Sequence, residues 1–79
     1  MDYMRFITRD PKICGGEPVM SGTRVTLRTL LASLADGDSP EAILADFPSL
    51  KPEHVWAAIA FAAASAQEDI PPPSIPKVA

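Results

Sequence analysis

The 79-residue sequence predicts a small, mainly α-helical domain in which three helices carry a short β arm. Apolar residues recur at helical spacing from residue 27 onward, and helix-start and helix-stop residues mark two further helical segments. The first 25 residues instead hold short β-branched runs around glycine turns. We therefore expect one domain at 1–69, with the arm at 1–25 and the helices at 26–69, followed by a Pro-rich extended tail at 70–79.

The arm is predicted to hold two or three very short strands. Arg5–Thr8 has the apolar and β-branched content of a strand. Val19–Met20 and Thr23–Val25 flank Ser21-Gly22, and a two-residue turn containing glycine favours a hairpin because glycine adopts positive φ readily. So small a sheet is marginal alone, and we expect it to lie against the helices or to pair with a second chain.

The first helix is predicted from its cap and from one apolar stripe. Thr26 stands where an N-cap belongs, because its hydroxyl can accept a hydrogen bond from an amide of the first turn. Gly37 is placed to close the helix in the left-handed conformation. The stripe that should face the core consists of Leu27, Leu30, Leu31 and Leu34.

The second helix is short and has a clear start signal. Ser39 fits the N-cap, Pro40 fits the first helical position, and Glu41 adds an acid near the positive end of the helix dipole. Pro48 ends the helix, since the residue before a proline is disfavoured in the α region. Its apolar side is expected to be Ile43, Leu44 and Phe47.

The third helix is predicted from about Pro52 to Glu68 and is apolar on nearly every side. Because no charged residue lies between His54 and Gln67, we expect this helix to be buried on two sides. Phe61 lies nearly opposite the expected core face, flanked by alanines, and we expect that side to meet a second chain. The expected core face is Val55, Trp56, Ile59, Ala62 and Ala66.

Few catalytic or metal-binding chemistries fit these residues. Cys14 is the only cysteine, so we expect no internal disulfide and no cysteine-based zinc site, but a reduced thiol in a cytoplasmic protein. His54 stands beside Glu53 near a helix start, where a surface or capping role fits better than metal ligation or general-base catalysis. The sequence contains no run of about 18 apolar residues, so it predicts no membrane span. We expect no enzyme activity, no cofactor and no metal.

Basic residues gather in the first part of an acidic chain. The net charge is −3, yet residues 1–28 carry five Lys and Arg side chains against three acids. Arg24 admits two interpretations, a phosphate contact or an internal ion pair with Asp46 or Glu17. The start of the third helix offers Glu53 and alanines, the wrong chemistry for reading base edges, so DNA contacts are expected from the arm and the first helix. The candidate DNA-binding residues are Arg9, Lys12, Arg24 and Arg28; scattered, solvated side chains are the alternative interpretation.

The tail that begins at Ile70 is too rich in proline for a helix and favours the polyproline II conformation. Its apolar residues can anchor it on a partner, and a dangling chain end is the alternative. The candidate partner-binding residues are Trp56, Phe61, Ile70, Ile75, Lys77 and Val78.

An ordered set of short motifs resembles a prokaryotic family catalogued as domain of unknown function 433, whose members are commonly described as VapB-like antitoxins. The resemblance covers roughly residues 7–66, and Lys51-Pro52 stands where the family usually has Thr or a similar cap. The Pro-rich tail lies outside the shared region. The motifs are Gly15-Gly16-Glu17-Pro18, Ser21-Gly22-Thr23-Arg24-Val25, Leu30-Leu31, Gly37, Ser39-Pro40-Glu41, Ile43-Leu44, Asp46-Phe47-Pro48 and Leu50.

This resemblance implies a homeodomain-like, helix-turn-helix-like trihelical fold with a short β arm, often dimeric. It also implies an antitoxin of a type II toxin–antitoxin system that binds and neutralises a PIN-like ribonuclease toxin and can repress its own operon. We expect the toxin's acidic metal-binding cleft to be occupied by a cation such as Arg24 or Lys77. The alternative hypotheses are a stand-alone DNA-binding regulator acting through the basic arm, and a dimeric scaffold with neither activity.

Overall fold

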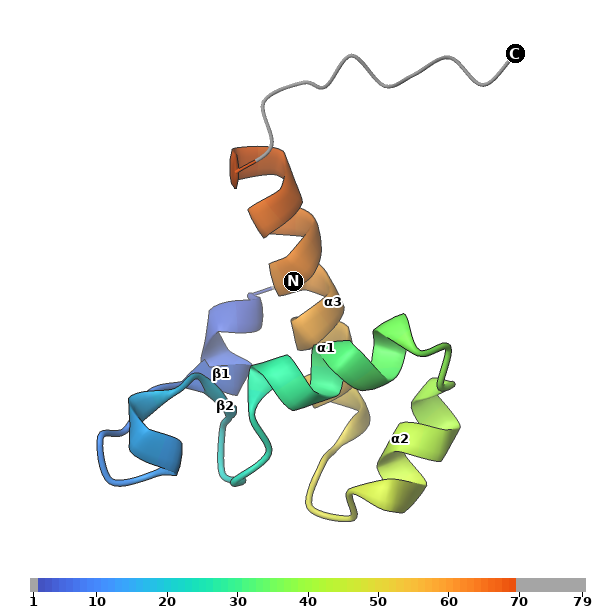
Figure 1. Cartoon of the computed structure of the whole chain (residues 1–79), viewed down its shortest axis with the longest axis horizontal. Coiled ribbons are helices and arrows are strands. Elements are labelled where there is room, and N and C mark those ends of the chain that lie inside the picture. The colour runs from blue at the N-terminus through green and yellow to red at the C-terminus, as the bar shows by residue number, and fades with distance from the viewer. Residues whose placement is uncertain (1, 70–79) are drawn as a thin grey trace.

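A computed structural model describes residues 2–69 of the chain, and the tail predicted from residue 70 lies outside the described residues. The described part is mainly helical, with three α-helices and one small two-stranded sheet (Figure 1). The elements, with 3-10 helices written η, are η1 (Tyr3–Phe6), β1 (Ile7–Thr8), η2 (Cys14–Gly16), β2 (Val19–Met20), α1 (Leu27–Ala35), α2 (Pro40–Asp46) and α3 (Pro52–Asp69).

The sheet of the arm is antiparallel and forms within one chain. Ile7 pairs with Met20, and Thr8 pairs with Val19. The strand predicted at Arg5–Thr8 is wrong in its first half, because residues 3–6 form η1, closed by a hydrogen bond from the Arg5 amide to the Asp2 carbonyl. This short helix lies against α3, where its aromatic side chains contribute to the core.

The return arm of the predicted hairpin is a tight turn rather than a strand. Gly22 has a φ of 79°, a value that glycine adopts without strain. The Thr23 hydroxyl, in a residue only 8% exposed, donates to the Met20 carbonyl at 2.8 Å and accepts from the Val25 amide at 3.0 Å. The Thr23 hydroxyl thus bonds to two backbone groups, the Met20 carbonyl and the Val25 amide, within the turn. After the turn, Thr26 pairs with Val19 in an isolated bridge.

Helix α1 begins and ends as predicted. The Thr26 hydroxyl accepts from the Thr29 amide at 3.1 Å, so the N-cap is confirmed. At the other end Gly37, with a φ of 91°, donates to the Leu34 carbonyl while Asp38 donates to that of Ser33. This pair of bonds is the Schellman motif, which satisfies carbonyls that the end of a helix leaves unpaired.

Helix α2 is also confirmed at its start. The Ser39 hydroxyl accepts from the Ala42 amide at 3.2 Å, and Pro40 occupies the first turn. Ile43 is fully buried, and Leu44 and Phe47 pack against the core from its edge.

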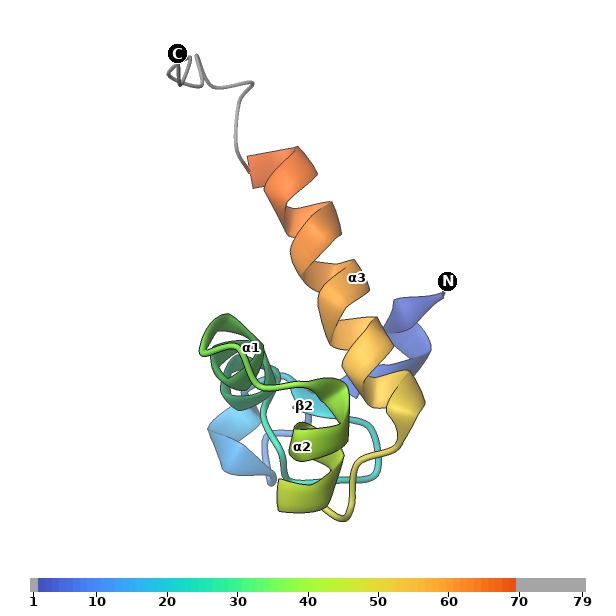
Figure 2. The ribbon, with the colours of Figure 1, turned by 90° about the vertical axis from the view of Figure 1, so that its right-hand side faces the viewer.

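The core lies where β2, α1, α2 and the first half of α3 meet. Of the predicted leucine stripe, Leu27 and Leu30 are buried and Leu31 and Leu34 are partly buried. The second half of α3 extends away from α1 and α2 (Figure 2). The buried core cluster is Met20, Leu27, Leu30, Ile43, Leu50, Val55, Ala57 and Ala58.

The predicted core face of α3 is confirmed at Val55, which is buried, and is wrong at three other positions, Trp56, Ile59 and Ala66. Trp56 and Ile59, expected in the core, are 56% and 37% exposed. Phe61, expected to face a second chain, is partly buried and meets Tyr3 edge to face, with ring centroids 6.1 Å apart. The difference follows from η1, because this unexpected helix covers the Phe61 side of α3 and leaves the side with Trp56 and Ile59 exposed.

His54 is buried, so the expected surface position is wrong, while the expected capping role is found. Its Nδ1 atom accepts from the Lys51 amide at 2.9 Å, which places the imidazole in the role that Glu or Gln plays in a capping box. Its Nε2 atom donates to the Ser21 carbonyl at 3.0 Å, and its ring meets Phe6 edge to face. One side chain therefore joins the start of α3, the Ser21-Gly22 turn and η1.

Candidate binding surfaces

The backbone at Arg24 is held from two sides, so its side chain projects from a well-supported turn. Thr23 fixes the preceding residue through its two hydroxyl bonds, and the Cys14 thiol donates to the Arg24 carbonyl at 3.4 Å. Cys14 itself has a φ of 51°, in the left-handed region, and opens the turn through Gly15 and Gly16. The paired glycines thus form a sharp turn, and this turn supports the Arg24 segment.

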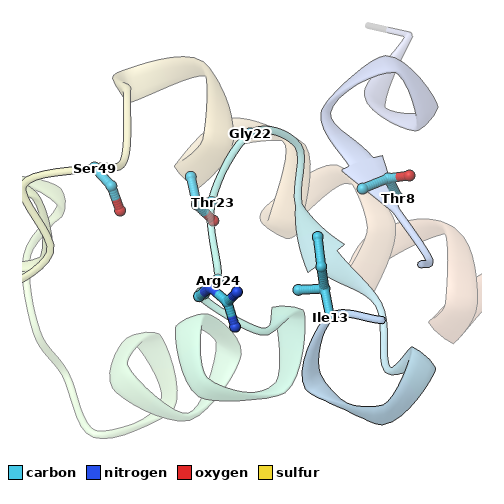
Figure 3. A pocket seen from close by; sticks show the side chains of 6 residues that line it. All are labelled: Thr8, Ile13, Gly22, Thr23, Arg24 and Ser49. Carbon is cyan, nitrogen blue, oxygen red and sulfur yellow. The ribbon is translucent and has the colours of Figure 1, made fainter. Parts of the chain in front are cut away.

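Arg24 lies beside an open groove of about 540 Å³. The groove is lined by hydroxyl-bearing residues and one apolar side chain from four separate parts of the chain, which Figure 3 shows together with Arg24. The Arg24 guanidinium and the hydroxyls of the exposed residues Thr8 and Ser49 suit an anionic partner group, because they can donate hydrogen bonds to oxygen, whereas the Thr23 hydroxyl already donates to the Met20 carbonyl. The lining residues are Thr8, Ile13, Gly22, Thr23, Arg24 and Ser49.

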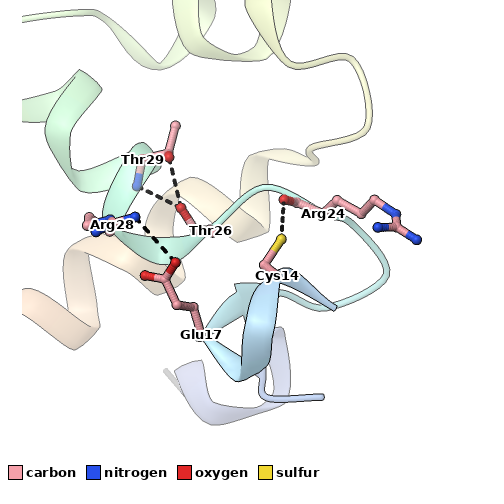
Figure 4. Close-up of polar contacts among 6 residues, drawn as sticks. All are labelled: Cys14, Glu17, Arg24, Thr26, Arg28 and Thr29. Atoms are coloured by element: carbon pink, nitrogen blue, oxygen red, sulfur yellow. Dashed lines mark hydrogen bonds and ion pairs between the residues drawn. The ribbon is translucent and has the colours of Figure 1, made fainter. Parts of the chain in front are cut away.

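The internal ion pairs considered for Arg24 do not form. Glu17 pairs with Arg28 instead, with Nη2 and Oε2 3.3 Å apart. Arg24 extends away from this pair (Figure 4), and no carboxylate of the described side chains forms an ion pair with it. The Arg28 side chain is 78% exposed, and an ion pair this exposed adds about 0–1 kcal/mol. Arg24 is therefore the cation that remains available to a partner on this side of the turn.

The other two candidate basic residues lie apart from Arg24. Arg9 is exposed and lines a second, smaller hollow of about 230 Å³ with Met4, Pro18 and Phe61 among its neighbours. Lys12 is exposed in the turn after β1, where its backbone amide donates to the Asp10 carboxylate at 2.9 Å. The structure thus exposes Arg9, Lys12, Arg24 and Arg28, and it does not bring them together around one groove.

A second surface is the uncovered side of α3. Trp56 and Ile59 are followed on the same side by the exposed alanines Ala63 and Ala66. Among the predicted partner-binding residues, Trp56 therefore lies on an accessible surface and Phe61 lies on the core side of the same helix. Ile70, Ile75, Lys77 and Val78 lie outside the described residues.

Sequence reasoning missed the groove and the connecting role of His54. The groove combines residues far apart in the chain, such as Thr8, Thr23 and Ser49, and no local pattern links them. The sequence did hold a signal for the capping role of His54. It is the third residue of a helix that starts at Pro52, the position from which a capping-box side chain bonds to the amide of the residue before the helix.

In the described part of the chain, no helix has the length and hydropathy to cross a membrane.

Comparison with known proteins adds a family and a solved fold. The family described as "Protein of unknown function (DUF433)" matches residues 7–62. A curated relative, uncharacterized protein y4eO of Sinorhizobium fredii, is 42% identical over 59 residues, which cover 75% of this chain and 27% of that protein. A crystal structure of a DUF433 member from Anabaena variabilis is similar with a TM-score of 0.68 and 29% identity, over 78% of this chain and 61% of the other. The chain thus corresponds to about a quarter of the length of y4eO.

Proposed function

Because this chain belongs to the DUF433 family of proteins of unknown function, we propose its role from its surfaces: it is a cytoplasmic, non-enzymatic antitoxin of a type II toxin–antitoxin system. It binds and neutralises a PIN-like ribonuclease toxin. The observation that carries the proposal is Arg24, an exposed cation on a braced turn with no ion-pair partner among the described side chains.

The chemistry of the toxin explains why such a cation inhibits. A metal-dependent ribonuclease holds its metal with carboxylates, and a guanidinium binds carboxylates through paired, charge-assisted hydrogen bonds. Arg24 in that cleft competes with the metal for the same oxygens. The groove beside Arg24 then receives the rim of the cleft, with the hydroxyls of Thr8 and Ser49 as further donors. Lys77 of the tail is the second candidate cation.

The test is a ribonuclease assay with purified toxin and this chain. We expect Arg24→Ala to weaken inhibition about 10-fold to 100-fold, the effect of losing a charge-assisted contact of about 1.5–3 kcal/mol. Arg28→Ala is the matched control, because Arg28 already pairs with Glu17 and is expected to leave inhibition unchanged. Full inhibition by the double variant Arg24→Ala, Lys77→Ala would rule out both cations.

A DNA-binding role is the second candidate, favoured by the exposure of four basic side chains in the N-terminal part of the chain. We propose for it a homeodomain-like, helix-turn-helix-like arrangement of α1 to α3. In this role the first helix and the arm contact phosphates, while α3 starts with the exposed side chains of Pro52, Glu53 and Trp56 and does not read bases. The antitoxin and the repressor roles are compatible in one protein.

Salt dependence tests the DNA-binding role. Each phosphate contact contributes a slope of about −0.9 to the logarithmic plot of affinity against salt. For the promoter fragment of the chain's own operon, we expect Arg24→Ala and Arg28→Ala each to reduce the slope by about one. A promoter fragment that is not retarded even at low salt contradicts this role and leaves the antitoxin proposal standing.

A further inference from the structure

The uncovered side of α3 has the spacing of a coiled-coil seam. Trp56, Ile59, Ala63 and Ala66 follow one another at intervals of three, four and three residues, and all four are exposed. This is the alternation of a and d positions that lets two helices pack side by side. The seam lies opposite the buried residues His54 and Ala58 and the partly buried Phe61, so a second helix can reach it without displacing the core.

We propose that this seam pairs with the same seam of a second copy of the chain, with the two α3 helices antiparallel. The order of side-chain sizes along the seam sets the orientation, because the two large residues come first and the two small ones last. In the antiparallel arrangement Trp56 faces the partner's Ala66 and Ile59 faces the partner's Ala63. Every layer then joins one large and one small side chain, which keeps the helices evenly spaced.

The parallel arrangement fails on the same criterion. It sets Trp56 against Trp56 at one end and Ala66 against Ala66 at the other, so the helices are forced apart where the residues are large and leave a gap where they are small. The antiparallel arrangement also places the start of one helix beside the end of the other, which the helix dipoles favour. From residue 55 to residue 67 the helix carries no charged side chain that would repel the second copy.

The size of the seam sets the expected strength of the dimer. Because Trp56 is already about half covered, two of these rings together remove about 150–300 Å² more from water, whereas a stable interface buries about 1,200–2,000 Å² in total. The seam therefore supplies the apolar centre of a small interface, and we expect a dimer that dissociates on dilution. This inference goes beyond the antitoxin role proposed above, since the pairing needs no toxin.

Sedimentation of the purified 79-residue chain tests the seam. We expect a concentration-dependent dimer, and we expect Ile59→Glu to weaken dimerisation more than about 100-fold, since it buries an unpaired charge. Ala45→Glu, at an exposed position on α2, adds the same charge elsewhere and is expected to leave the dimer intact. Trp56, the only tryptophan, reports the same equilibrium, because its emission shifts to the blue as the seam becomes buried.

Disulfide trapping tests the orientation. In a Cys14→Ser background, chains carrying Ile59→Cys and chains carrying Ala63→Cys are mixed and oxidised. The antiparallel seam predicts mixed products that join the two variants, whereas same-site products overturn the orientation. A monomer at all concentrations, or a dimer that tolerates Ile59→Glu, overturns the seam. If Trp56 emission shifts to the blue only when a ribonuclease is added, the seam binds the toxin and the dimer is overturned. If the dimer is intact but the ribonuclease is not inhibited, the result counts only against the antitoxin role.

Discussion

At the scale of single residues, His54 shows how one buried side chain can determine several contacts. Both ring nitrogens have partners, since Nδ1 accepts from Lys51 and Nε2 donates to the Ser21 carbonyl. These two bonds require the neutral imidazole with its proton on Nε2. Ser21 in turn donates its amide to the Phe6 carbonyl and its hydroxyl to that of Arg5, so His54 reaches η1 through a single intermediate residue.

Replacing His54 by alanine is expected to lower the free energy of unfolding by about 2–4 kcal/mol. The loss combines two part-buried hydrogen bonds to the backbone, at about 0.5–1.5 kcal/mol each, with the cavity left beside Phe6. Lys51→Ala is the matched control, because it removes an exposed side chain, keeps the backbone amide and is expected to change stability by about 0.5 kcal/mol or less. Urea unfolding followed by circular dichroism measures both. A loss below about 1 kcal/mol for the histidine variant contradicts the role assigned to its ring.

Thr23 offers a second test of the same kind, because its hydroxyl both donates and accepts within the turn that carries Arg24. Thr23→Val keeps the shape and removes both bonds, so we expect a loss of about 1–3 kcal/mol in the free energy of unfolding. Thr23→Ser keeps the hydroxyl and removes only a methyl group, so the free energy of unfolding should fall by about 1 kcal/mol. Equal losses for the two variants, measured by thermal unfolding, would show that the hydroxyl bonds do not support the turn.

At the scale of elements, caps and turns could be predicted from sequence, but the faces of α3 could not. Thr26, Ser39 and Gly37 act through contacts with residues at most four positions away, which a local pattern records. The side that α3 buries depends on η1, an element more than 45 residues earlier that the strand-like composition of Arg5–Thr8 concealed. The Arg24 groove could not be predicted either, because its lining residues are far apart in the chain, although Arg24 itself was a candidate binding residue from the sequence.

The two faces of α3 can be distinguished by matched aromatic truncations. Phe61→Ala removes a partly buried ring that packs on Tyr3, and we expect a loss of about 1.5–3 kcal/mol in the free energy of unfolding. Trp56→Ala removes an exposed ring, so in dilute, monomeric solution it should cost about 0.5 kcal/mol or less. Chemical denaturation at low protein concentration checks the pair. A larger loss for the tryptophan variant would restore the faces predicted from sequence.

At the scale of the whole molecule, the proposed toxin binding and the proposed dimerisation use two separate surfaces. The Arg24 groove lies on the side of the turn between β2 and α1, and the seam runs along the opposite face of α3 from the core. A dimer formed through the seam therefore leaves both Arg24 side chains available to a partner. Since this chain matches about a quarter of the length of y4eO, the same domain also occurs within a longer protein.

The role proposed for this chain is to neutralise a ribonuclease. Its most direct test is to purify tagged residues 1–79 and residues 1–69 from the source cells, identify any bound protein by mass spectrometry, and measure RNA cleavage before and after the two are separated. We predict a stoichiometric complex with a PIN-like ribonuclease that is inactive when bound and active once released. Loss of the complex in the shorter chain would assign the contact to the tail, and its retention would assign the contact to the Arg24 side. Recovery of the bare chain, or of a partner without ribonuclease activity, would contradict the claim.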